Sequence, residues 1–155
     1  MGIRMGRFAI LLAVTLWGLA VRPAWSGTCL ALTGEEPERT IVTLPIAAGA
    51  IFHLEFINSI YLAKVRESFV FNPEDGIFLV SVESPSHGVF EYYGLIPDAM
   101  GRVRLNRPIG EIRLKSHDYE HHLLIIGDEQ IHLKTCMANG KALIIRVLMG
   151  ERCQP

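Results

Sequence analysis

Asn58 and Glu67 are the polar residues of this sequence whose positions most suggest a binding site. If the segments around them are strands, each side chain shares a face with apolar neighbours, because side chains alternate between the two faces. A hairpin that pairs Phe56 with Phe69 places Asn58 opposite Glu67. A buried carboxylate is costly unless it is hydrogen-bonded or protonated. We therefore expect either a satisfied polar pair near the sheet rim or a pocket for a polar ligand.

Two adjacent tyrosines, Tyr92 and Tyr93, could complete such a pocket. With Phe90 they form an aromatic cluster. Aromatic rings stack on ligands, but in β-rich domains they also fill cores and interfaces. The candidate ligand-binding residues are therefore Asn58, Glu67, Tyr92 and Tyr93, and a purely structural role for the tyrosines is the alternative.

Familiar catalytic motifs are missing from the sequence. It contains no Gly-x-Ser-x-Gly elbow, no phosphate-binding glycine loop, no Cys-x-x-Cys and no His-Glu-x-x-His. No nucleophile or base is evidently placed beside Asn58 and Glu67. The sequence therefore favours a protein that is not an enzyme, and it predicts no cofactor.

Histidines in the C-terminal third raise the question of a metal site. A hairpin that pairs Leu124 with Leu133 separates His121 from His132 by four residues, or about 13 Å along the strand. Zinc ligands, in contrast, lie about 2.0–2.3 Å from one point. His121 and Cys136 could supply only half a site. We therefore expect solvated histidines and no metal.

Short apolar or alternating runs between turn residues predict strands, and no clean helical stripe follows residue 30. The predicted strands are 41–45, 51–61, 64–71, 76–83, 89–93, 111–116, 121–126, 130–136 and 142–148. Asn139-Gly140 predicts a hairpin that pairs Cys136 with Leu143, which makes the last three strands a meander. The fold class is all-β, as an antiparallel sandwich or small open barrel of about eight or nine strands. Residues 93–111 are expected to form a loop or a crossover.

The first 26 residues have the pattern of a signal peptide. Arg4 and Arg7 precede an apolar run over 8–21, and Ala24-Trp25-Ser26 supplies small residues before a cleavage site. The 14 residues of this run, apolar apart from Thr15 and Gly18, span about 21 Å as a helix, less than the roughly 30 Å hydrocarbon core of a membrane. We expect cleavage after residue 26 and a single β-rich domain over 27–155 in the periplasm or another extracytoplasmic space. Retention of the leader as a membrane anchor is the alternative.

Three cysteines follow the leader, at Cys29, Cys136 and Cys153. In an oxidising compartment two of them should pair. Cys29 and Cys153 lie near opposite ends of the domain, and the termini of small domains often lie close together. A disulfide between them is the candidate pairing, and three unpaired cysteines are the alternative.

Composition limits the classes of partner. Half of the residues are hydrophobic and 20% are charged, which excludes an intrinsically disordered chain. The net charge of −1 provides no basic field for nucleic acid. Contact with a membrane is expected only through an uncleaved leader.

A signature in the central region resembles a known family. The motif begins with Gly49, Phe52 and Leu54. The run 56–60 comes next, and Val65-x-Glu67-x-Phe69 follows it. The pattern is similar to that of a bacterial family of small exported proteins, the domain of unknown function eighteen-fifty. Genes of this family often lie beside those of TAXI-type TRAP transporters, which import solutes with a periplasmic binding protein. The resemblance covers roughly residues 29–148.

The chain departs from the family pattern at three places. Asn58 stands where the family usually has His, and Lys64 stands where Pro is usual. A Gly-x-Gly stretch is reduced here to Ser86-His87-Gly88. The amide of Asn58 can hydrogen-bond Glu67 but cannot carry a proton as an imidazole does.

The resemblance implies a compartment and a genetic neighbourhood rather than a mechanism. We expect a non-enzymatic exported domain that is accessory to TRAP-type solute uptake and contacts a transporter or its solute-binding protein. An exposed sheet edge or the aromatic cluster would be the contact surface. A small-ligand binding module around Asn58 and Glu67 is the first alternative, and an enzyme is disfavoured.

Overall fold

The computed structural model describes residues 27–35 and 38–153, so the expected signal peptide at 1–26 lies outside the described residues. The elements are, in chain order, β1 Thr28–Gly34, β2 Arg39–Pro45, β3 Ile51–Asn58, β4 Ala63–Asn72, β5 Gly76–Glu83, α1 His87–Tyr93, β6 Arg102–Pro108, β7 Ile112–Lys115, β8 Leu123–Ile126, β9 Glu129–His132, α2 Leu133–Cys136, β10 Ala142–Met149 and the 3-10 helix η1 Gly150–Cys153. Across the described part of the chain, no helix is long and apolar enough to cross a membrane.

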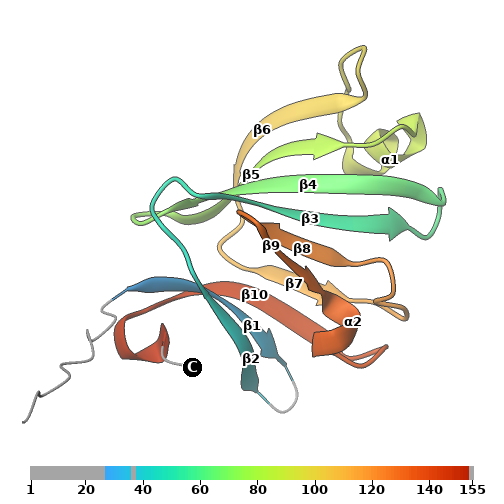
Figure 1. The fold of residues 1–155 in the computed structure, drawn as a ribbon. Helices are drawn as coiled ribbons and strands as arrows, with labels where there is room; N and C mark the ends of the chain where they lie inside the picture. Colours follow the sequence, from blue (N-terminus) through green and yellow to red (C-terminus); the bar gives the residue numbers. More distant parts are fainter. Residues whose placement is uncertain (1–26, 36–37, 154–155) are drawn as a thin grey trace, which may run out of the picture.

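The strands form two antiparallel sheets, with the orders β2-β1-β10-β7 and β6-β5-β4-β3-β8-β9. In Figure 1 the four-stranded sheet occupies the lower half of the molecule, and the six-stranded sheet lies above it with α1 at its far end. The sheets do not close into a barrel, and the arrangement is that of a β sandwich. The all-β prediction is confirmed, although ten strands are present in the described residues rather than eight or nine.

Apolar residues from both sheets form one buried core. Leu32 of β1 and Ile145 of β10 belong to the same cluster as Phe52 and Leu54 of β3, and all four are fully buried. Burying one such side chain contributes about 1.5–3 kcal/mol. Their spacing of two residues within β3 is the strand alternation that the sequence predicts.

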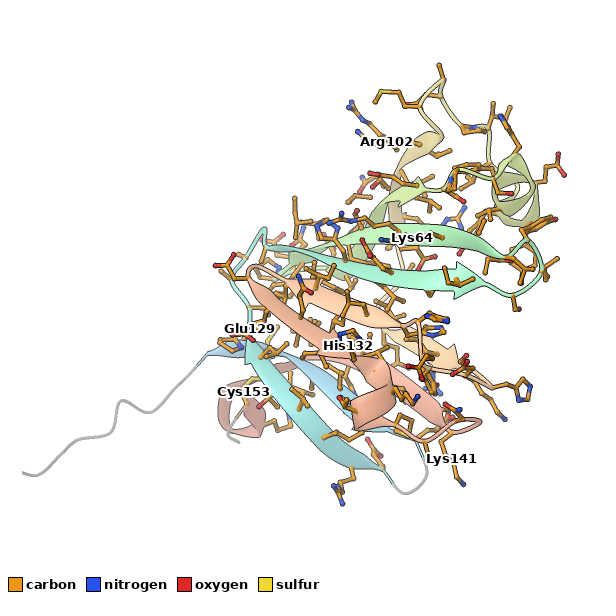
Figure 2. The ribbon with its side chains drawn as sticks, turned by 45° about the vertical axis from the view of Figure 1, so that its right-hand side comes forward. Lys64, Arg102, Glu129, His132, Lys141 and Cys153 are labelled. Carbon is orange, nitrogen blue, oxygen red and sulfur yellow. A yellow bond between two sulfur atoms is a disulfide. The ribbon has the colours of Figure 1, made fainter. Side chains whose placement is uncertain are left out.

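A disulfide joins the two ends of the described chain. Cys29 of β1 bonds to Cys153 of η1, with a Cα–Cα distance of 5.6 Å and a sequence separation of 124 residues. The predicted pairing is therefore confirmed. Cys136 is a half-buried free thiol in α2. Figure 2 shows Cys153 at the end of the sandwich away from Lys64 and Arg102, at the starts of β4 and β6.

The hairpin of β3 and β4 does not have the predicted register. Asn58 lies opposite Ala63, and Glu67 lies opposite Leu54, so the prediction that Asn58 faces Glu67 is wrong. The strands are displaced by an even number of residues, and the apolar set therefore still faces the core. The difference comes from the turn, which occupies 59–62, whereas the predicted pairing of Phe56 with Phe69 centres the turn on 62–63.

The predicted strand at 89–93 is wrong, because these residues belong to α1. Val89, Phe90 and Tyr93 lie on one side of a helix and pack on the core. Gly94 ends the helix in the left-handed conformation, with φ 66°. Its N–H donates to the Glu91 carbonyl, and the N–H of the next residue donates to the Phe90 carbonyl, a Schellman motif.

The predicted C-terminal meander is also wrong. Leu124 lies opposite Ile131 rather than Leu133, across a two-residue turn at 127–128. The chain then leaves the sheet, because β9 ends at His132 and α2 follows. Asn139-Gly140 is a turn, but β10 pairs with β1 and β7 of the other sheet, so Cys136 does not face Leu143 across a hairpin.

Candidate functional site

Asn58 holds the turn between β3 and β4 rather than lining a pocket with Glu67. Its Oδ1 accepts hydrogen bonds from the backbone N–H groups of Ile60, at 3.0 Å, and Tyr61, at 3.1 Å. Asparagine favours such turns because its short side chain reaches the backbone two or three residues ahead. Asn58 therefore has a local structural role here.

Replacing Asn58 by alanine should lower the free energy of unfolding by about 1 kcal/mol, because two backbone donors lose their acceptor. Asn58→Asp keeps an acceptor oxygen and should retain most of that stability. Urea unfolding of the two variants measures the difference. Equal stability of Asn58→Ala and the parent chain would contradict the role of the amide.

Glu67 and Tyr93, in contrast, are brought together. The Tyr93 hydroxyl donates a hydrogen bond of 2.7 Å to Glu67 Oε1. Glu67 lies on the inner face of the large sheet, between Leu54 on β3 and Val82 on β5. The carboxyl group is therefore covered by α1 at the end of the core. The expected polar pair of Asn58 and Glu67 is not formed, and Tyr93 is the partner of Glu67 instead.

The environment of this pair disfavours negative charge. Burial raises the pKa of Glu67, and the hydrogen bond from Tyr93 opposes that rise without cancelling it. Burial is also the main cause of the strongly raised pKa of Tyr93, and the Glu67 carboxylate adds to it. The tyrosine is therefore a fixed donor, and the pair locks α1 onto the sheet.

Tyr92, the fourth candidate, points outward and belongs to an exposed apolar surface. The turn between β3 and β4, α1 and the loop before β6 lie at the same end of the large sheet (Figure 1), because β3 and β5 end there and β4 and β6 begin there. We call the exposed hydrophobic residues of these segments the apolar tip. Its members and their exposed fractions are Ile60 66%, Tyr61 39%, Leu62 81%, Tyr92 67%, Ile96 92% and Met100 81%. Elsewhere in the described residues, the exposed large hydrophobics are Ile51, Ile57 and Met149.

The segments of the apolar tip pack against one another. The ring of Tyr61 lies on Gly88 of α1 so closely that a Cβ there would be 2.3 Å from Tyr61 Cε1. Beyond α1, Asp98 Oδ1 accepts hydrogen bonds from the N–H groups of Met100, at 2.9 Å, and Arg102, at 3.0 Å. The tip is thus a shaped surface built on a capped turn, a helix and a second capped loop.

Leu62 has a backbone conformation that glycine and asparagine adopt more readily than leucine. Its φ is 50°, in the left-handed region, and among the described residues it is the non-glycine with positive φ. A residue with a Cβ loses about 1–2 kcal/mol there. Burial within this chain does not compensate, since the side chain is 81% exposed. Backbone strain of this kind is concentrated at functional sites.

Of the residues of the apolar tip, Tyr92 was predicted from the sequence. The other five were not: Ile60, Tyr61, Leu62, Ile96 and Met100. The available signal was the turn at 59–62, in which large aliphatic residues stand where glycine or asparagine is usual.

The histidines occupy different environments. The ring of His122 stacks on Phe56, with centroids 5.6 Å apart, and meets the edge of the buried Tyr119. Burial lowers the pKa of His122. His121 and His132 are exposed. In the described part of the chain, no group of three or more His, Cys, Asp or Glu residues is arranged to hold a metal ion.

The comparisons with known proteins give no relative. No family model, no curated protein and no solved structure matches this chain. The resemblance to the exported family therefore stays a prediction.

Proposed function

We propose that this chain is a non-enzymatic exported interaction domain whose apolar tip docks on an apolar surface of a partner protein. The observation that carries the proposal is Leu62, which is strained and 81% exposed within a group of six exposed hydrophobic residues. Surfaces of this kind, with polar residues at their rim, are typical of interaction sites. The family resemblance supports an accessory role in TRAP-type solute uptake, with the transporter or its solute-binding protein as the partner.

The charges beside the tip and the position of Gly27 favour a protein rather than a lipid surface as the partner of the tip. Exposed Glu91 and Asp98 flank the tip, and anionic headgroups would repel them. The cations at this end, Lys64 and Arg102, already form ion pairs with Glu55 and Glu83. The described chain begins at Gly27, whose carbonyl accepts a hydrogen bond from Gly150 at the disulfide end of the sandwich. A leader that remained in the membrane would therefore hold the molecule by the end opposite the tip (Figure 1).

Site-specific photo-crosslinking in cells tests the proposal. A photoreactive residue at Ile96, which is 92% exposed, should give an adduct with a protein, and the same residue at Met149, 51% exposed in β10, should not. Mass spectrometry identifies the adduct, and the purified partner is then used for titration. Adducts with phospholipid, with a second copy of the chain, or equally from both positions would contradict docking at the tip.

Leu62→Asn separates docking from folding. Asparagine tolerates the left-handed conformation, so the variant should be more stable than the parent by about 0.5–1 kcal/mol in urea unfolding. It should nevertheless bind the purified partner about tenfold more weakly, because an apolar contact is lost. Met149→Gln is the matched control and should leave the affinity unchanged. Unchanged affinity of Leu62→Asn would remove Leu62 from the interface.

A further inference from the structure

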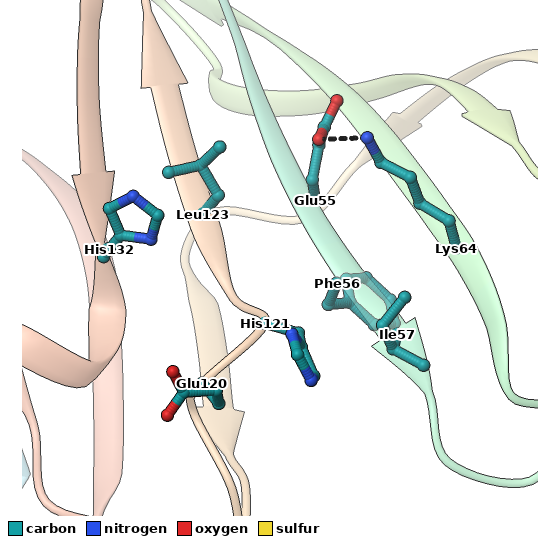
Figure 3. A pocket seen from close by; sticks show the side chains of 8 residues that line it. All are labelled: Glu55, Phe56, Ile57, Lys64, Glu120, His121, Leu123 and His132. Atoms are coloured by element: carbon teal, nitrogen blue, oxygen red, sulfur yellow. Dashed lines mark ion pairs between the residues drawn. The ribbon is translucent and has the colours of Figure 1, made fainter.

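A second candidate site, separate from the apolar tip, lies where β8 leaves β3. The two strands pair only from Phe52 to Glu55 of β3, and Leu123, the first residue of β8, is opposite Glu55. Beyond this point β3 continues to Asn58 without β8 beside it. A cavity of about 250 Å³ opens there (Figure 3).

The cavity has an apolar floor and a polar rim. Phe56, Ile57 and Leu123 supply apolar surface. In Figure 3, His121 and His132 lie on the side of β8 and β9, across the opening from the Glu55–Lys64 ion pair. A floor of this kind holds the apolar body of a ligand, and polar groups at the rim set its orientation.

The carboxylates of the cavity already have cationic partners. Glu55, whose side chain is 13% exposed, contacts Lys64 Nζ at 2.6 Å and Arg66 Nη1 at 3.6 Å. Glu120 forms an ion pair with Lys134. Three cationic side chains therefore surround two carboxylates, and this charge balance disfavours a cationic ligand in the cavity.

The imidazoles are the unused polar groups. Within the described residues, the side chains of His121 and His132 form no hydrogen bond or ion pair, although their ring N–H groups are able to donate. A carboxylate accepts such bonds with two oxygens. From this geometry we propose that the cavity binds a small organic carboxylate, with its charged group between His121 and His132 and its apolar body on Ile57 and Leu123, which share a face of the sheet.

The volume limits the ligand to a small molecule. A cavity of about 250 Å³ corresponds to roughly eight water volumes of ~30 Å³ each. Phenylacetate, a one-ring carboxylate, is a suitable probe, and phenylacetamide and benzylamine are its neutral and cationic counterparts. A ligand of this size in an open site should bind with a Kd of about 1 mM.

Backbone amide shifts in NMR titration test the proposal. Phenylacetate should shift the amide resonances of Ile57 and Leu123, and phenylacetamide and benzylamine should bind at least tenfold more weakly. The double variant His121→Gln/His132→Gln should lower the phenylacetate affinity about tenfold. His87→Gln changes an exposed histidine of α1, outside the cavity, and should have no effect.

Three results would overturn the carboxylate site. They are equal binding of the neutral or cationic probe, shifts confined to other parts of the molecule, and full affinity in the double variant. Because both histidines are exposed, the double variant should fold normally, and its amide spectrum without probe verifies this. The docking proposal is tested by the Leu62 and Ile96 variants and does not depend on any of these results.

Discussion

Replacing Cys29 and Cys153 together by alanine will lower the free energy of unfolding by about 5 kcal/mol. The bond spans 124 residues, and the loss of chain entropy that a crosslink imposes on the unfolded state grows with the length of the closed loop. A domain of this size commonly has a total stability of about 5–15 kcal/mol, so the loss is a large part of it. Guanidinium unfolding of the oxidised parent and the double variant measures the difference.

Two controls isolate the disulfide. Cys136→Ala removes a half-buried free thiol and should cost far less. Reduction of the parent chain should reproduce most of the loss seen in the double variant, because both open the same loop. A double variant as stable as the oxidised parent would mean that the crosslink does not constrain the unfolded chain as the entropy argument requires.

Tyr93→Phe will lower the free energy of unfolding at neutral pH by about 2 kcal/mol, because it leaves the Glu67 carboxylate without its donor. Glu67→Gln should have the opposite effect at neutral pH, since the amide oxygen still accepts the hydrogen bond and carries no charge. In the Glu67→Gln background, Tyr93→Phe should cost only about 1 kcal/mol. Chemical unfolding of the four chains gives this coupling directly.

The pH dependence of these variants has a definite sign. The pKa of Glu67 is raised in the folded state, so the folded protein binds the proton more tightly than the unfolded one. The stability contributed by protonated Glu67 is complete below the ordinary pKa of 4.5, and it is lost as the pH rises through the folded value. Glu67→Gln should therefore stabilise the protein increasingly above that ordinary pKa and have little effect below it.

Control substitutions test whether Glu67 and Tyr93 cause this pH dependence of stability. Tyr92→Phe changes an exposed ring beside Tyr93, and Glu74→Gln removes an exposed charge from a turn. Neither should alter stability or its dependence on pH. Because His53 and His122 have lowered pKa values and titrate in the opposite sense, each variant is compared with the parent at the same pH. A constant difference across the pH range would contradict the assignment to Glu67.

The sequence predicted which face of a strand is buried more reliably than it predicted which residues pair between strands. Alternation placed Leu54 and Glu67 on the inner face, and the structure confirms this although their registers differ from the prediction. Register depends on the turn, and a turn with Leu62 in the left-handed region has no glycine or asparagine to mark it. The side chain of Asn58 determines this turn, and its role is visible only once the backbone path is known.

Two strands, β1 and β6, were not predicted from the sequence, for different reasons. β1 lies between β2 and β10, and its residues from Cys29 to Gly34 are buried on both faces, so they show no alternation. β6 does alternate, with Val103 and Leu105 each between polar residues, but it falls within the segment 93–111 that was expected to be a loop or a crossover. The apolar tip was missed for a further reason, because it includes α1, which the sequence predicted as a strand.

The disulfide between β1 and η1 also changes what a protease can do to this protein. The bond makes the chain from Cys29 to Cys153 a covalent ring. A cut at an exposed turn such as 73–75, between β4 and β5, opens that ring but releases no fragment. The two pieces stay joined, each with strands that pair with the other, so the sandwich can survive a single cleavage until the bond is reduced. A single cleavage inside the ring therefore nicks the backbone without removing any part of the domain.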